Sequence, residues 1–101
     1  MEGKLIFLPV VADDLAAAIA YYEPISPRLA ARFRQAVNQR FDDILNRPKT
    51  FPMDVGDVRF ARTLRFPYLV FFQIRDNLIF IIAVLHGASN PAEWRKRAIT
   101  G

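Results

Sequence analysis

Three arginines in the C-terminal half have the clearest capacity for chemistry. Side chains alternate between the two faces of a strand, so Arg59 and Arg65 are expected on one face of the second predicted strand and Arg62 on the other. Guanidinium groups on a strand can bind phosphates through paired hydrogen bonds, or stabilise negative charge that develops on phosphorus. They can equally bind the carboxylates of a partner protein or pair with acidic side chains of this chain. The spacing alone favours none of these roles.

The other candidates follow the last predicted strand. His86 ends that strand, and we interpret this lone histidine as a hydrogen-bonded structural residue rather than a member of a catalytic triad. Trp94 is expected to anchor a short C-terminal helix to the sheet, with its indole N–H available for a hydrogen bond at the rim. The Arg95-Lys96-Arg97 run is interpreted as a solvated basic face.

This sequence lacks the residues that most known catalytic motifs require. It has no P-loop, no glycine fingerprint for a dinucleotide, and no His, Asp and Glu cluster at metal-ligand spacing. Its lack of cysteine excludes disulfides, thiolate metal sites and a cysteine nucleophile. The acidic pairs Asp13-Asp14 and Asp42-Asp43 are interpreted as solvated or helix-capping charges. We therefore predict no cofactor and no metal.

Length and composition predict one folded domain over residues 1–101. Hydrophobic residues make up 52% of the chain, which excludes intrinsic disorder. The formal net charge is +4, and residues 58–101 hold seven basic side chains against two acidic ones. This half of the chain would suit an acidic partner.

A membrane span is not expected. The longest unbroken apolar run is the eight residues 78–85, whereas a transmembrane helix needs about 20. The apolar segment 5–12 is followed by Asp13-Asp14 where a signal peptide would have small residues for cleavage. A cytoplasmic location is the prediction.

The periodicity changes from helical to extended along the chain. Residues 3–9 predict a strand, residues 13–22 a helix, and Ser26-Pro27 the start of a second helix that ends at Arg47-Pro48. After a loop over 48–57, three strands are expected over 58–64, 68–74 and 78–85, and Asn90-Pro91 starts a helix over 92–98. The predicted fold class is α+β in the order β-α-α-β-β-β-α. A helical hairpin would pack on a curled, mostly antiparallel four-stranded sheet.

Three short segments occur in a characteristic order and spacing: RFPYLVFF at 65–72, AVLHG at 83–87 and NPAEWRKR at 90–97. Upstream of them stand a YY pair at 21–22, a long amphipathic helix and a Phe-Pro loop. Together these segments resemble the RelE/ParE superfamily of bacterial toxin–antitoxin and plasmid stabilisation modules, and within it the ParE-like branch. The resemblance covers nearly the whole chain and implies the same element order.

Two activities occur among the proteins that this chain resembles. RelE-like toxins cleave messenger RNA on the ribosome, whereas ParE-like toxins inhibit DNA gyrase and have no established catalytic residues. Where RelE-like enzymes place two arginines and a C-terminal tyrosine, this chain has Leu69, Gly87-Ala88 and Trp94. A tryptophan has no ionisable hydroxyl for proton transfer.

The resemblance therefore implies a gyrase-inhibiting toxin that a cognate antitoxin neutralises. The alternatives are a RelE-like ribonuclease, for which Arg62, Arg65 and His86 would be the catalytic residues, and an inactive homologue that only binds antitoxin. Homodimerisation and direct binding of nucleic acid stay open. The residues expected to bind the partner or target are Arg59, Arg62, Arg65, His86, Trp94, Arg95 and Arg97.

Overall fold

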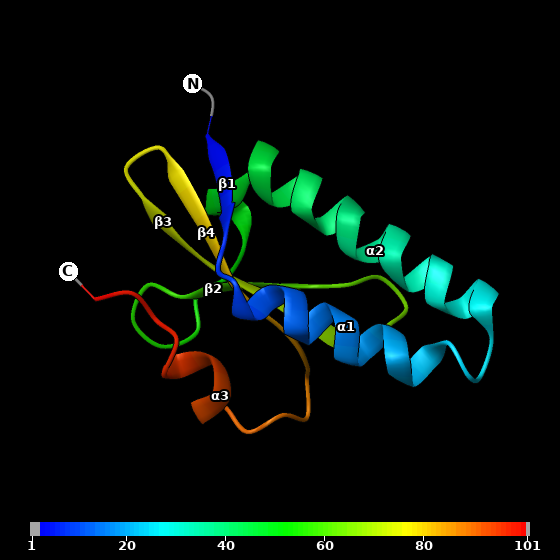
Figure 1. Cartoon of the computed structure of the whole chain (residues 1–101). Helices are drawn as coiled ribbons and strands as arrows, with labels where there is room; N and C mark the ends of the chain where they lie inside the picture. Colours follow the sequence, from blue (N-terminus) through cyan, green and yellow to red (C-terminus); the bar gives the residue numbers. More distant parts are fainter. Residues whose placement is uncertain (1–2, 101) are drawn as a thin grey trace.

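A four-stranded mixed sheet is the scaffold of the computed structural model, which describes residues 3–100 (Figure 1). Its strands are β1 (Lys4–Phe7), β2 (Arg59–Arg62), β3 (Tyr68–Arg75) and β4 (Leu78–His86). The strand order is β1-β4-β3-β2, with β1 parallel to β4 and the other neighbours antiparallel. The predicted central position of the last strand, which is apolar on both parities, is confirmed.

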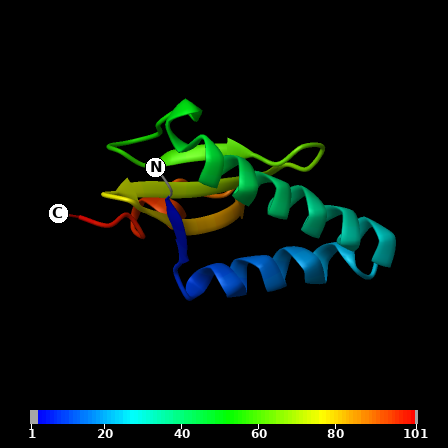
Figure 2. The same ribbon diagram turned by 90° about the horizontal axis from the view of Figure 1, so that it is seen from above.

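Two long helices cover one face of this sheet. They are α1 (Val10–Tyr22) and α2 (Pro27–Asn46), joined by a short turn into the predicted hairpin (Figures 1 and 2). The start of α2 is fixed as the sequence indicates, because the Leu29 N–H donates to Ser26 Oγ at 3.2 Å and Pro27 occupies the first helical position. Within residues 3–100, no helix is long and apolar enough to cross a membrane.

The helix-side core is built on the apolar stripe predicted for the second helix. Its buried members Phe33, Val37, Phe41 and Ile44 pack against side chains of β3 and β4. Phe33 contacts three further aromatic rings, with ring centroids 5.0 to 5.4 Å apart, those of Tyr22, Phe66 and Tyr68.

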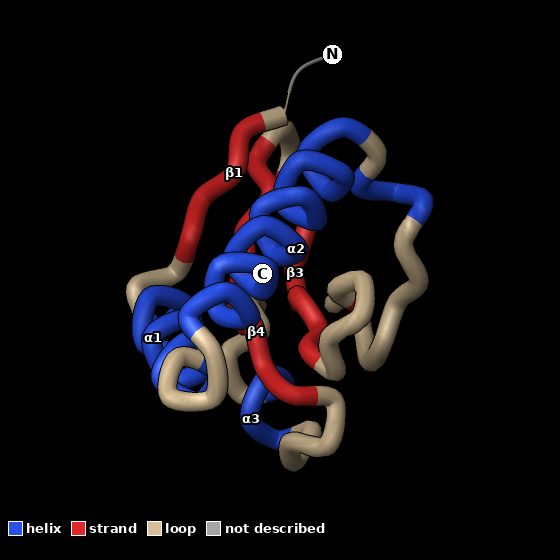
Figure 3. Tube along the Cα trace, turned by 90° about the vertical axis from the view of Figure 1, so that its right-hand side faces the viewer, coloured by secondary structure: helices blue, strands red, loops and turns tan. Residues whose placement is uncertain are grey.

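The other face of the sheet has a second, smaller core. Phe71, Ile82, Ala83 and Val58 are buried there together with Trp94. A β-bulge between β3 and β4 shapes this region: Phe71 pairs with Ala83 and Phe72 with Ile81, so Ile82 is left without a partner on β3. The C-terminal helix α3 (Ala92–Arg95) lies apart from the hairpin, beyond the end of β4 (Figure 3).

Several boundaries differ from the sequence predictions. Strand β1 is shorter than expected, Lys4–Phe7 instead of residues 3–9. Helix α1 begins at Val10 rather than near Asp13, because Pro9 already has helical backbone angles. Strand β2 ends at Arg62, since the backbone and side chain of Thr63 bond to the carbonyl of Tyr68 and close a turn. Helix α3 ends at Arg95 rather than at residue 98.

Candidate functional site

Asp54 holds α3 against the sheet from the loop that precedes β2. The Trp94 indole N–H donates to Asp54 Oδ2 at 2.8 Å, and the Arg95 guanidinium donates to both oxygens of the same carboxylate at 3.2 Å. The Trp94 ring stacks on Phe71, with centroids 4.2 Å apart and planes 14° from parallel. Trp94 thus anchors the last helix, as expected, and its N–H has a specific carboxylate acceptor.

A buried ion pair joins the C-terminal segment to α1. The Arg97 guanidinium donates to Asp14 at 2.7 and 3.2 Å, and the two side chains are only 14% and 7% exposed. Asp14 Oδ2 also accepts the Val84 N–H, and Arg97 donates to the Ile82 carbonyl.

These contacts correct two sequence interpretations. Asp14 is not a solvated or capping charge, because α1 begins at Val10 and therefore turns residue 14 toward β4. Nor is the 95–97 run a uniformly solvated face. Arg97 is largely buried on Asp14 and Arg95 pairs with Asp54, while Lys96 stays exposed near Glu93.

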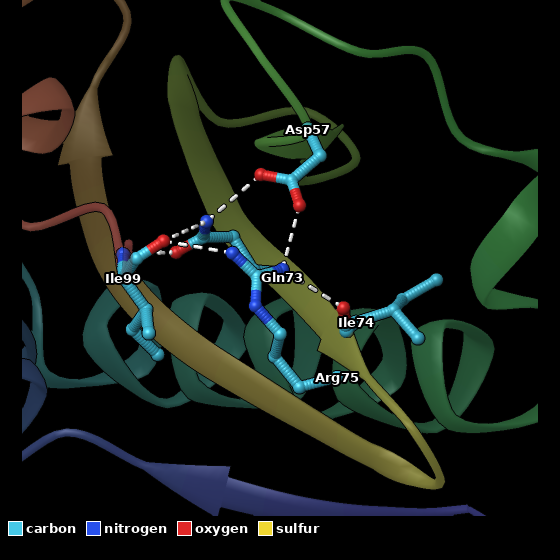
Figure 4. A network of polar contacts seen from close by, with 5 residues as sticks. All are labelled: Asp57, Gln73, Ile74, Arg75 and Ile99. Atoms are coloured by element: carbon cyan, nitrogen blue, oxygen red, sulfur yellow. Dashed lines mark hydrogen bonds and ion pairs between the residues drawn. The ribbon is translucent and has the colours of Figure 1, made fainter. Parts of the chain in front are cut away.

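Gln73 holds the end of the chain on β3 (Figure 4). Its buried amide accepts the Ile99 N–H at 2.7 Å and donates to the Ile99 carbonyl at 3.2 Å, as a neighbouring strand would. Its Nε2 also donates to Asp57 Oδ1. Arg75 joins the same two partners, donating to Asp57 Oδ2 at 2.6 Å and to the Ile99 carbonyl at 2.7 Å.

Both loop carboxylates are stabilised in their ionised form by these bonds. Hydrogen bonds from Arg95 and, more weakly, from Trp94 lower the pKa of Asp54 against the opposing effect of burial. Hydrogen bonds from Gln73 and Arg75 lower the pKa of Asp57 in the same way. Two deprotonated aspartates therefore contribute to the attachment of the C-terminal segment, Asp54 directly and Asp57 through Gln73 and Arg75.

This dependence predicts acid sensitivity. A carboxyl whose pKa is lower in the folded state stabilises the fold above its unfolded pKa, and that stabilisation is lost as the pH falls through the folded value. The free energy of unfolding should thus decline below about pH 4. Urea unfolding between pH 3 and 7 measures the decline, which should be shallower in Asp54→Asn. An identical pH profile in that variant would contradict the assignment.

The three arginines of the β2 region have different surroundings. Arg59 is held internally, because its guanidinium donates to the carbonyls of Phe51 at 2.7 Å and Lys49 at 3.3 Å. Arg62 and Arg65 are exposed, and neither forms an ion pair with a carboxylate of residues 3–100. Arg65 lies in the turn after β2 with a φ of 70°, so it does not share a strand face with Arg59.

Two of the residues considered for ribonuclease chemistry, Arg62 and His86, do not converge, whereas Arg65 lies in the turn that precedes β3. Arg62 pairs across the sheet with Leu69, and Leu69 with Leu85; both leucines pack on the Trp94 side. His86 follows Leu85 and therefore has the opposite parity. Its ring lies 5.4 Å from that of Tyr68, which belongs to the helix-side core. Arg62 and His86 thus belong to opposite faces of the sheet.

Two cavities flank the turn between β2 and β3, near the closed end of the helical hairpin. The first, of about 620 Å³, is lined by Leu29, Arg32, Gln35, Ala36, Gln39, Leu64, Arg65 and Phe66. The second, of about 440 Å³, is lined by Tyr21, Tyr22, Ile25, Pro67, Tyr68 and His86. Large apolar side chains border both: Tyr21, Ile25 and Leu64 are each more than 60% exposed. Sequence reasoning missed these cavities because their walls come from separate segments.

Known proteins share this architecture. The family described as "ParE toxin of type II toxin-antitoxin system, parDE" matches residues 5–91. This chain belongs to the ParE toxin family. A solved structure described as a chromosomal ParDE toxin–antitoxin system from P. aeruginosa has the same fold. Its TM-score is 0.75 at 21% identity, over 84% of this chain and 96% of that chain. No curated protein sequence matches this chain significantly.

Membership of the ParE family confirms the resemblance and the fold class predicted from the sequence. The match ends at Pro91, so α3 and the contacts of Trp94, Arg95 and Arg97 lie beyond it.

Proposed function

We propose that this chain is a single-domain ParE toxin that acts in the cytoplasm, is neutralised by a cognate antitoxin and inhibits DNA gyrase. The observation that carries the proposal is the ParE family match over residues 5–91. Within this superfamily, the ParE-like branch is the one associated with gyrase.

The geometry weighs against the ribonuclease alternative. Arg62 and His86 belong to opposite faces of the sheet, so they would not act on one phosphodiester. At the position where RelE-like enzymes have a tyrosine, the Trp94 indole is buried and bound to Asp54. RNA cleavage needs a base for the 2′-hydroxyl and cationic support at the same phosphate. Arg62, His86 and Trp94 do not provide that combination.

The test is a gyrase supercoiling and DNA-cleavage assay with purified, antitoxin-free protein. We expect loss of supercoiling and accumulation of cleaved DNA, and addition of the cognate antitoxin should reverse both. Circular dichroism on the same sample establishes that the toxin is folded. A folded protein without effect on gyrase at high excess would overturn the proposed target. The search would then move to ribosome-bound messenger RNA or to an inactive toxin.

The exposed arginines are expected to contact an acidic segment of the antitoxin. Reversing both charges, in Arg62→Glu/Arg65→Glu, should weaken antitoxin binding by about tenfold at low salt and flatten its salt dependence. Arg59 is left unchanged because its guanidinium holds two loop carbonyls. Titration calorimetry at several salt concentrations measures both effects.

Arg34 provides the control for this charge reversal. It is exposed on α2 but lies two positions from both Arg32 and Ala36, so helical geometry turns it away from the first cavity. Arg34→Glu should leave affinity and salt dependence nearly unchanged. Because Arg34→Glu changes the net charge by half as much as the double variant, a loss of half the size on a logarithmic scale would mean that only the net charge matters, and would contradict a specific contact.

A further inference from the structure

The second cavity has aromatic walls and polar tips. We call it the aromatic pocket; it is lined by Tyr21, Tyr22, Ile25, Pro67, Tyr68 and His86. Its volume of about 440 Å³ lies within the range of sites that bind small organic groups, about 300–1,000 Å³. It is on the helix side of the sheet, because Tyr22 and Tyr68 belong to the core beneath the hairpin.

Three polar groups of the aromatic pocket are left for a ligand. The Tyr22 and Tyr68 hydroxyls and His86 Nε2 form no hydrogen bond within residues 3–100. Every fully buried side-chain nitrogen or oxygen atom of those residues does have a hydrogen-bond partner. These three atoms are therefore accessible from outside. The Ala88 N–H donates to His86 Nδ1 at 2.9 Å, so in the neutral ring Nε2 carries the proton and donates. Burial and neighbouring tyrosines raise the pKa of Tyr22, and the same causes raise the pKa of Tyr68, so both remain neutral phenols.

The adjacent first cavity supplies positive charge. It shares the turn between β2 and β3 with the aromatic pocket, since Phe66 lines one cavity and Pro67 the other. Arg32 and Arg65 line it, and neither pairs with a carboxylate of residues 3–100. No acidic residue lines either cavity. This combination of aromatic rings beside unpaired guanidinium groups complements a base attached to a phosphodiester backbone.

We propose that the aromatic pocket binds an unpaired base of single-stranded nucleic acid, while Arg32 and Arg65 contact the flanking phosphates. Tyr21, which is 64% exposed, provides a ring face for stacking. The edge of a base carries several donors and acceptors, and can therefore satisfy the two hydroxyls and the imidazole N–H. An aliphatic or phenyl side chain from a protein would leave all three desolvated without partners, which is unfavourable. This binding is separate from the proposed gyrase interaction, and it shares Arg65 with the proposed antitoxin contact, so antitoxin and single strand would compete for that residue.

Fluorescence anisotropy with the full-length, antitoxin-free protein tests the proposal. The probes are labelled 12-nucleotide single strands of DNA and of RNA, the DNA strand as a duplex, and an abasic DNA strand of the same length. We expect a single strand to bind more tightly than the duplex and the abasic strand. The DNA and RNA probes show which backbone the site prefers.

Two substitutions separate stacking from phosphate contact. Tyr21→Ala should weaken binding of the single strand by about tenfold and bring it close to the abasic strand. Arg65→Gln should reduce the slope of log affinity against log salt by about 0.7. Arg34→Gln, which removes the same charge outside both cavities, should leave the slope unchanged. Because both test residues are exposed, a thermal melt of each variant should match that of the parent.

Three results would overturn the proposal. The first is the absence of binding to any single strand, and the second is equal binding of the abasic and normal strands. The third is a Tyr21→Ala variant that binds nucleic acid normally but antitoxin poorly, which would assign the pocket to a protein side chain. The anisotropy measurement involves no gyrase, so its outcome is independent of the outcome for the proposed function.

Discussion

Asp14→Ala should lower the free energy of unfolding by about 3–5 kcal/mol, the usual loss when one partner of a buried ion pair is removed. The substitution would leave the Arg97 guanidinium, only 14% exposed, without its carboxylate. It would also remove the acceptor of the Val84 N–H at the edge of β4. Urea unfolding followed by far-UV circular dichroism at pH 7 measures the change.

The neighbouring residue provides a matched control. Asp13 is exposed in the first turn of α1, so Asp13→Ala removes the same chemical group from solvent rather than from the interior. It should cost less than about 1 kcal/mol, the range of a helix-dipole contribution. Asp14→Leu/Arg97→Met should recover part of the loss, since no unpaired charge is then buried. A cost for Asp14→Ala as small as that for Asp13→Ala would contradict a buried pair.

The ion pair lies beside the part of β4 that continues beyond the end of its neighbour β1. Parallel pairing of β1 with β4 ends at Phe7 and Ile81, and the Leu8 N–H makes the last bond across. Beyond that point the chain turns into α1, while β4 continues through the unpaired Ile82 at the bulge. Asp14 accepts the Val84 N–H and Arg97 donates to the Ile82 carbonyl, so the pair takes the place of the missing strand. Buried backbone groups without partners would otherwise destabilise the sheet.

The elements could be predicted from the sequence because burial imposes a period on them. The stripe of Phe33, Val37, Phe41 and Ile44 repeats every three or four residues and is buried in the structure. The strand over 78–85 is apolar on both parities because both of its faces are covered. Boundaries depend on single residues, as at Thr63, and are therefore less evident.

The roles of polar residues could not be predicted in the same way, because periodicity carries no information about contacts distant in sequence. Asp14 meets Arg97 across 83 positions, and Asp54 meets Trp94 across 40. One sequence signal does indicate such a contact: Gln73 interrupts an otherwise apolar stretch of β3. A polar side chain at a buried position needs a partner, which pointed to a polar contact at this place.

Trp94→Ala should lower the free energy of unfolding by about 3–5 kcal/mol, as expected for truncating a buried aromatic side chain. Trp94 is 6% exposed and stacks on Phe71 at the centre of the smaller core. Its loss would also leave the Asp54 carboxylate with Arg95 alone. Urea unfolding followed by circular dichroism measures the change.

Trp94→Phe separates the ring from its hydrogen bond. Phenylalanine keeps a face for stacking on Phe71 but has no N–H for Asp54, so the substitution should lower the free energy of unfolding by about 1–3 kcal/mol.

The parent protein offers a second check, since Trp94 is its single tryptophan. If α3 belongs to the cooperative fold, the urea transitions followed by tryptophan fluorescence and by far-UV circular dichroism should coincide. A fluorescence transition at lower urea would mean that α3 detaches before the sheet unfolds. Trp94→Ala would then cost much less than predicted, because the smaller core would persist without its helix.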